Sequence, residues 1–199
     1  MTRTRFAQTT RRTALALAAA SAATAHAAPA VLDPVVVTAT RSEAAPLDLP
    51  ASITRIAGDE LRAGRAQVNI SEGLAGVPGL LARDRQNYAQ DVQISVRGFG
   101  ARASFGIRGV RVYVDDIPAT LPDGQGQITN VEIGTVGRVE VLRGPFSALY
   151  GNSSGGVISI YSEAPDGPPR VDASVAFGSD SLQRVAATAS GQVGSFSYT

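Results

Sequence analysis

The pentapeptide Gly151-Asn-Ser-Ser-Gly155 has the G-x-S-x-G spacing that presents a serine nucleophile on a tight turn in many hydrolases. Such a serine needs a neighbouring base, usually histidine or lysine, to accept its proton. The chain contains no lysine, and His26 is its only histidine. The pentapeptide is therefore expected to form a glycine turn, and we predict that the protein is not an enzyme.

Metal chemistry has equally few candidate residues. The chain has no cysteine, and its most suggestive carboxylates are Asp115, Asp116 and Asp123. Metal sites require several ligands close together, and two neighbouring aspartates between apolar segments more often shape a turn. We therefore expect neither a resident metal nor a cofactor.

The sequence offers more candidate residues for binding a ligand than for catalysis or for binding a metal. Two polar, glycine-rich loops, 102–108 and 117–126, bracket the alternating segment 110–118. Loops at the end of a rigid strand are the usual place for binding residues. Four side chains there are predicted to contact a ligand: Arg102, Arg108, Asp123 and Gln125. Two arginines suit an anionic ligand such as a carboxylate-bearing chelate, although the four residues could equally hold the loops together.

The elements around these loops are organised on the segment 139–160. Its pattern predicts a strand, a turn at Gly144-Pro145, one helical turn, a glycine loop and a second strand. Proline ends the first strand because it has no N–H for a ladder, and the glycines allow positive φ.

Three ordered motifs in this segment are Val-Glu-Val-Leu-Arg-Gly-Pro, Ala-Leu-Tyr-Gly and Gly-Gly-Val-Ile. Together they resemble the plug domain of TonB-dependent outer-membrane receptors. The resemblance implies an α+β domain, a small mixed sheet with short helices, that fills the lumen of a barrel. It also implies that Glu140 and Arg143 pair with barrel-wall charges of opposite sign, although a solvated face is the alternative.

The plug is expected over residues 47–165. Strands are predicted at 51–56, 80–83, 91–100, 110–118 and 131–142, with a turn at Asp115-Asp116. One helix is expected to begin at Asp59 as its N-cap. A second is expected at Asn69, with Glu72 completing a capping box.

Residues 166–199 alternate between apolar and polar side chains in three segments, 171–177, 182–190 and from 196 onward, with turns at 178–181 and 191–194. Such segments are typical of transmembrane β-strands and also of soluble hairpins. The position after a plug favours the start of a barrel. Because receptors of this kind close with about 22 strands, the chain is expected to be an N-terminal fragment or a truncated receptor.

Residues 1–27 have the pattern of a secretory signal peptide, with four arginines, an apolar stretch and the cleavage site Ala25-His26-Ala27. Cleavage after Ala25 is the alternative. Without these residues the chain has 14 arginines and 17 acids, a net charge of −3, which argues against a nucleic-acid partner.

Residues 28–46 form a predicted linker that contains three consecutive valines. Valine favours extended backbone, so this segment is either a strand of the domain or a strand for a partner. The resemblance identifies it as a TonB box, made of Asp33, Pro34, Val35, Val36, Val37, Thr38 and Ala39.

The resemblance implies a receptor in the outer membrane of a Gram-negative bacterium, with its barrel in lipid. It implies uptake of a ferric siderophore or a similar chelate or cofactor, driven by TonB and inner-membrane energising proteins. The two loops resemble those of siderophore and pyrroloquinoline quinone receptors. The alternatives are a stand-alone periplasmic plug-like binding module and a non-functional truncated receptor.

Overall fold

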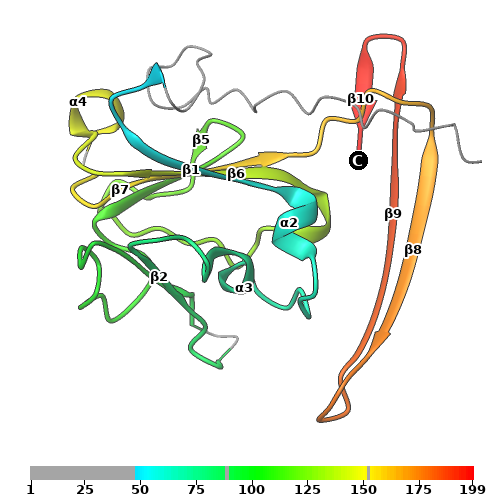
Figure 1. Cartoon of the computed structure of the whole chain (residues 1–199), viewed down its shortest axis with the longest axis horizontal. Coiled ribbons are helices and arrows are strands. Elements are labelled where there is room, and N and C mark those ends of the chain that lie inside the picture. Colours follow the sequence, from blue (N-terminus) through cyan, green and yellow to red (C-terminus); the bar gives the residue numbers. More distant parts are fainter. Residues whose placement is uncertain (1–47, 88–89, 152) are drawn as a thin grey trace, which may run out of the picture. The chain divides into compact units, whose positions relative to one another are not determined.

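The computed structural model describes residues 48–87, 90–151 and 153–199. The predicted signal peptide and the TonB box at 33–39 lie outside the described residues. The described chain forms a mixed sheet with short helices, followed by a separate antiparallel sheet (Figure 1). The α+β architecture expected of a plug is therefore confirmed.

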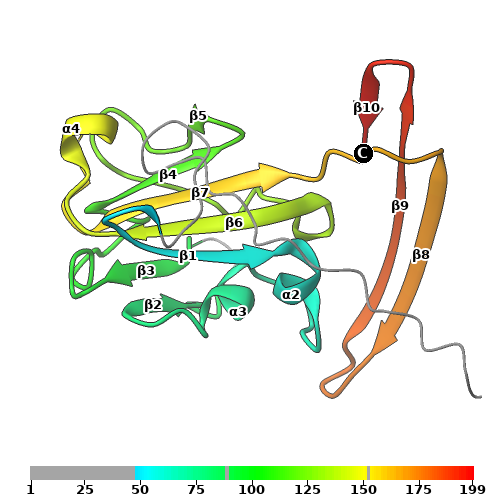
Figure 2. The same ribbon diagram turned by 45° about the horizontal axis from the view of Figure 1, so that its top comes forward.

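The main sheet has five strands in the order β1-β6-β7-β4-β5 (Figure 2). In chain order they are β1 (Ser52–Ala57), β4 (Val110–Val114), β5 (Ile117–Pro118), β6 (Val136–Arg143) and β7 (Gly156–Ser162). β4 and β7 are parallel, and the other neighbours are antiparallel. The central strands are rich in valine and isoleucine because both of their faces are largely buried.

One face of this sheet carries the larger core. Two helices and a two-stranded sheet supply side chains to it: α2 (Gly58–Arg62), α3 (Ser71–Leu74), β2 (Leu80–Arg83) and β3 (Gln93–Val96). Leu74, Ile94 and Val139 are each 0% exposed. Full burial of such a side chain contributes about 1.5–3 kcal/mol, so this core is the main stabilising feature of the domain.

The opposite face holds a smaller cluster around Leu142 and Val157. The helix α4 (Ser147–Tyr150) contributes Tyr150, whose ring meets Tyr113 edge-on with centroids 5.5 Å apart. The cluster explains why the segment between β6 and β7 makes a helical turn: the turn returns an aromatic ring to the sheet.

The two helix starts differ in how well the sequence predicted them. Asp59 is not the N-cap of α2; Ala57 is, and its side chain makes no capping hydrogen bond. Asp59 lies in the first turn instead and pairs with Arg62 at 2.7 Å. At α3 the N-cap is Ile70, one residue later than predicted, and its side chain makes no capping hydrogen bond. The two side-chain hydrogen bonds expected of Asn69 and Glu72 are present: Glu72 accepts from the backbone N–H of Asn69, and the Asn69 side chain accepts from the N–H of Ser71, both at 3.0 Å.

The predicted turn at Asp115-Asp116 is also confirmed, with φ values of 48° and 65°. Positive φ costs a non-glycine residue about 1–2 kcal/mol. The Asp115 carboxylate offsets this cost by accepting hydrogen bonds from the backbone N–H and the hydroxyl of Ser162, both at 2.7 Å. The turn thus also ties β4 to the end of β7.

The third sheet contains β8 (Arg170–Phe177), β9 (Gln183–Val193) and β10 (Phe196–Tyr198) in an antiparallel meander. The turn expected at 191–194 is wrong: β9 continues to Val193, and the chain turns at Gly194. Gly191 is needed for close approach, since a Cβ atom there would lie 2.6 Å from the Cα of Pro169.

The strand expected at 131–142 begins later than predicted. A 3-10 turn, η2 (Ile133–Thr135), precedes β6. The side chain of Glu132 accepts a hydrogen bond from the N–H of Gly134 at 3.1 Å, which closes this turn. Among the described residues, no helix has the length and apolar character needed to cross a membrane.

Candidate functional site

Three of the four predicted ligand residues meet in one cluster. The Arg108 guanidinium lies 3.4 Å from a carboxylate oxygen of Asp123 and donates to the Asp123 backbone carbonyl at 3.2 Å. It also donates to the side-chain oxygen of Gln125 at 3.2 Å. The two loops that were expected to act together are therefore in direct contact.

Backbone pairing between the loops fixes this cluster. Ile107 and Gly126 exchange two N–H to C=O hydrogen bonds, at 2.9 and 2.7 Å. The hydroxyl of Thr120 accepts from the N–H of Val112 at 2.9 Å, which fastens the second loop to β4. At Gly106, with φ +60°, a Cβ atom would lie 2.6 Å from the side chain of Gln125. The glycine therefore allows the loops to approach.

Arg102 lies beside this cluster, on the same groove of about 450 Å³ that Arg108 and Phe99 line. Two aromatic side chains in this region are exposed, Phe99 at 50% and Phe105 at 64%. Sequence reasoning did not select them as site residues, although exposed aromatic rings in a glycine-rich loop are a recognisable signal for binding. The site thus combines cationic and aromatic groups.

The cluster lies at a defined end of the main sheet. Arg108 comes two residues before the start of β4, and β7 runs parallel to β4. The chain leaves the far end of β7 at Ser162 and continues to β8 (Figure 2). The loops 102–108 and 117–126 and the connection to β8 therefore lie at opposite ends of the sheet.

The ion pair in this cluster is exposed. The Arg108 side chain is 47% exposed and the Asp123 side chain 57% exposed. Exposed pairs of this kind contribute about 0–1 kcal/mol. The guanidinium can therefore turn from Asp123 to another anion at little cost.

Glu140 and Arg143 have partners inside the domain. Glu140 is 0% exposed and accepts from Nε of Arg138 at 2.8 Å, so the solvated face considered for Glu140 is wrong. Arg143 donates to the hydroxyl of Thr54 at 2.8 Å and to the carbonyl of Pro78 at 2.5 Å. Pairing of these two residues with barrel-wall charges stays a prediction.

The neighbourhood of Glu140 includes a stacked arginine. The Arg138 guanidinium carbon lies 3.8 Å from the centre of the Tyr161 ring. Burial, followed by the charges of Asp116 and Glu140, raises the pKa of Tyr161 to about 12. Its hydroxyl is thus protonated at neutral pH and donates to Asp116 at 3.3 Å.

The serine at the nucleophile position of the hydrolase-like pentapeptide is buried. Ser153 is 0% exposed, and its hydroxyl donates to the carbonyl of Gly151 at 3.2 Å. Gly151 has a φ of +74°, as a glycine turn requires. In the part of the chain that the structure describes, no three His, Cys, Asp or Glu side chains form a group that could hold a metal.

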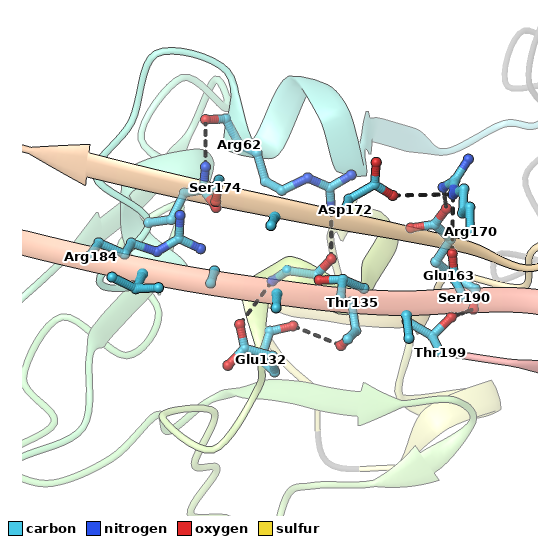
Figure 3. A pocket seen from close by; sticks show the side chains of 18 of the residues that line it. Arg62, Glu132, Thr135, Glu163, Arg170, Asp172, Ser174, Arg184, Ser190 and Thr199 are labelled. Carbon is cyan, nitrogen blue, oxygen red and sulfur yellow. Dashed lines mark hydrogen bonds and ion pairs between the residues drawn. The ribbon is translucent and has the colours of Figure 1, made fainter.

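A second, polar cleft of about 900 Å³ was not anticipated from the sequence (Figure 3). Its lining includes Arg62 and Glu132 from the plug side and Asp172 and Arg184 from β8 and β9. At one end Arg170 pairs with Glu163 at 2.7 Å. The charges of this cleft are distributed in both signs, so it has no marked preference for an anion or a cation.

The sheet of β8 and β9 has two unlike faces. Polar side chains of one face line the cleft in Figure 3. The other face carries paired apolar residues, such as Val175 opposite Val185, which are 61% and 79% exposed. Phe177 and Val171 extend this face, at 78% and 75% exposed. A contiguous apolar face of this kind indicates contact with a nonpolar environment.

Comparison with known proteins identifies the fold. The family model described as TonB-dependent Receptor Plug Domain matches residues 45–157, more than half of the chain. The chain belongs to this family. The resemblance found in the motifs of residues 139–158 is thereby confirmed, and the two loops between residues 102 and 126 lie within the matched region.

Among curated relatives, the vitamin B12 transporter BtuB of Vibrio vulnificus is 29% identical over 74% of this chain and 23% of its own length. The pesticin receptor of Yersinia pestis is 36% identical over 53% of this chain and 15% of its own length. The match to this chain thus spans less than a quarter of the length of each of these relatives.

Solved structures give the same family. The ferric yersiniabactin uptake receptor FyuA of Yersinia pestis is 30% identical with a TM-score of 0.54, covering 73% of this chain and 22% of its own. The pyoverdine outer membrane receptor FpvA of Pseudomonas aeruginosa, at 24% identity, shares the fold with a TM-score of 0.61 over 81% of this chain and 22% of its own. These relatives are receptors and transporters, not enzymes.

Proposed function

We propose that this plug binds an anionic chelate, such as a ferric siderophore, on its loop cluster and gates the chelate's uptake across the outer membrane of a Gram-negative bacterium. The single observation that carries the proposal is the contact of Arg108 with Asp123 and Gln125, beside Arg102. Relatives that take up ferric yersiniabactin and vitamin B12 support uptake of a small molecule.

The orientation follows from the topology. The connection to β8 leaves the sheet at the end opposite to the loop cluster. In a receptor whose first barrel strand starts from the periplasm, the cluster therefore faces outward. Arg102 and Arg108 then lie on the side from which an anion arrives.

The way in which the plug would bind an anion follows from the weak ion pair between Arg108 and Asp123. An anionic ligand can take one or two hydrogen bonds from the Arg108 guanidinium, which gives up its long contacts with Asp123 and Gln125. The exposed rings of Phe99 and Phe105 suit the nonpolar parts of the same ligand. Once Arg108 no longer holds Asp123 and Gln125, the loop 117–126 can change its conformation. Ligand binding would in this way alter the structure of the plug.

Two further parts complete the proposal. The TonB box at 33–39 is proposed to pair as a strand with TonB, and Glu140 and Arg143 to face the barrel wall. The apolar face at Val171, Val175 and Phe177 supports a barrel strand in lipid. The same face argues against a stand-alone periplasmic module, which would leave these side chains in water.

The test is ligand binding and uptake by the complete receptor. Cells expressing it are offered radiolabelled iron as a ferric tris-catecholate, a ferric hydroxamate and a ferric citrate, with a cobalamin in parallel. Arg102→Ala combined with Arg108→Ala is expected to reduce binding of the anionic chelate at an unchanged receptor level. Arg83→Ala, an exposed arginine on β2, is the matched control. Unchanged affinity in the double variant removes both arginines from the site.

A further inference from the structure

The loop 101–105, which carries Arg102, is not part of a strand. Two of its N–H groups, of Ala101 and Ala103, donate to nearby backbone carbonyls, and its own carbonyls accept from side chains. The loop lies between Gly100 and Gly106, which have φ values of +87° and +60°. A Cβ atom at Gly100 would lie 2.4 Å from the carbonyl oxygen of Arg108. Both ends of the loop are therefore closely packed, and the backbone between them needs its own hydrogen-bond partners.

Arg85 supplies two of these partners. Its Nη1 donates to the carbonyl of Ser104 and its Nη2 to the carbonyl of Ala103, both at 2.7 Å. A planar guanidinium suits two adjacent acceptors because its N–H groups form a fixed fork. Charge-assisted hydrogen bonds of this length are among the stronger ones in proteins. Arg85 thus fixes the middle of the loop.

Gln93 supplies a third contact, from its side-chain amide to the carbonyl of Ala101 at 2.9 Å. Gln93 begins β3, and Arg85 follows the end of β2. The two-stranded sheet is itself anchored in the main core, where Ile94 and Val96 are 0% exposed. The loop therefore rests on a rigid support outside the ligand groove.

The arrangement separates the loop into an inner and an outer side. The carbonyls of Ala101, Ala103 and Ser104 are held from within, while Arg102 and Phe105 are exposed. Within residues 48–87, 90–151 and 153–199, Nε of Arg85 is buried without a hydrogen-bond partner. Nε of Arg55, Arg111 and Arg143 is in the same state, so the distinguishing contacts of Arg85 are the two hydrogen bonds of its Nη groups to the loop.

We infer that Arg85 is a positioning residue for the ligand site: it holds the loop 101–105 so that Arg102 and Phe105 face the incoming ligand beside Arg108. The inference rests on the proposed function for its ligand. Its structural part, that Arg85 determines the order of this loop, is independent of what the ligand is.

The chain has no cysteine, so a single introduced cysteine can carry a nitroxide spin label. One label is placed at Phe105→Cys in the loop. The reference label is placed at Ile117→Cys, an exposed position, 70% accessible, on β5. Each is combined with Arg85→Ala, Arg85→Lys and the control Arg83→Ala, and the electron paramagnetic resonance line shape is recorded.

Arg85→Ala is expected to shorten the correlation time of the label at 105 severalfold and to leave the label at 117 unchanged. Arg85→Lys should restore part of the order of the loop. An ammonium group can donate a hydrogen bond to one of the two carbonyls, but it lacks the fixed fork that lets a guanidinium donate to both. Arg83→Ala should change neither label. An unchanged label at 105 overturns the inference, and so does equal loosening at both positions, since that describes a general loss of packing.

Binding of a ferric tris-catecholate to the complete receptor separates this inference from the proposed function. Arg85→Ala is expected to weaken binding about tenfold, as for the loss of one or two charge-assisted hydrogen bonds. If only the Arg102→Ala and Arg108→Ala pair weakens binding, the positioning role is refuted and the proposed function stands. If that pair has no effect, the proposed ligand site fails, whatever the label at 105 shows.

Discussion

The glycine at position 156 gives the sharpest prediction about the plug's stability. It has a φ of +147° and pairs with Arg143 across β6 and β7. A Cβ atom there would lie 2.1 Å from the carbonyl oxygen of Leu142, which is far too close. The backbone of one of the two strands would have to shift to make room for it. Gly156→Ala therefore combines backbone strain with overpacking.

The magnitude follows from these two costs. Backbone strain at such a φ costs about 1–3 kcal/mol. Forcing a methyl group into a packed strand pair costs a further 1–3 kcal/mol, roughly. A total of about 4 kcal/mol lowers the melting temperature of a chain of this size by roughly 10 °C.

Gly151→Ala is the matched control. Gly151 has a φ of +74°, but no atom lies within 4 Å of its Cβ position. Only the conformational cost of about 1–2 kcal/mol applies, and the melting temperature should fall by a few degrees. Circular dichroism melts of both variants measure the difference. Equal melting temperatures for the two variants would refute the argument from the Leu142 contact.

Two other predictions concern the hairpin and a buried carboxylate. Val175→Arg puts a charge on the exposed apolar face and should prevent assembly of the complete receptor in the outer membrane, whereas Ser174→Arg on the other face should be tolerated; equal membrane levels in heat-modifiability gels would contradict a lipid-facing β8. Burial raises the pKa of Asp91 above its ordinary value of 3.8, so the folded protein holds this proton more tightly than the unfolded chain does. The stability that comes from the protonated Asp91 is complete below pH 3.8 and is lost as the pH rises through the folded-state pKa. Relative to Asp91→Asn, wild type should therefore lose stability between acid and neutral pH, and a gain in urea midpoint over this range would show the opposite sign.

Much of the fold was predictable because its signals are local. Valine and isoleucine alternation located β3, β4, β6 and β7, and the Asp115-Asp116 turn followed from the tolerance of aspartate for positive φ. Glu72 was recognised as a capping residue from its spacing alone. These features depend on residues close together in the chain.

The features that sequence reasoning missed depend on distant contacts. Asp59 was expected to cap α2, but it pairs with Arg62 instead. Gly191 was expected in a turn, but the close approach of Pro169 explains it. Arg85 gave no signal as a functional residue, because its partners Ala103 and Ser104 are backbone carbonyls almost twenty positions away.

The candidate site was predictable in part. Arg108, Asp123 and Gln125 were selected for their residue types in paired loops, and the structure brings them together. Arg102 shares their groove without joining their hydrogen bonds. Their contact with ligand, like the TonB box at 33–39, remains a prediction.

The proposed TonB box at residues 33–39 gives the most direct test of the proposed function. In the complete receptor, Val37→Pro removes an N–H donor and fixes φ within the proposed TonB box, whereas Val37→Ala keeps the backbone able to pair. Surface binding and energised uptake of a radiolabelled ferric chelate are measured in the same cells. The proposal predicts normal binding with no uptake for Val37→Pro and substantial uptake for Val37→Ala. Normal uptake in Val37→Pro, or loss of binding together with uptake, would contradict it.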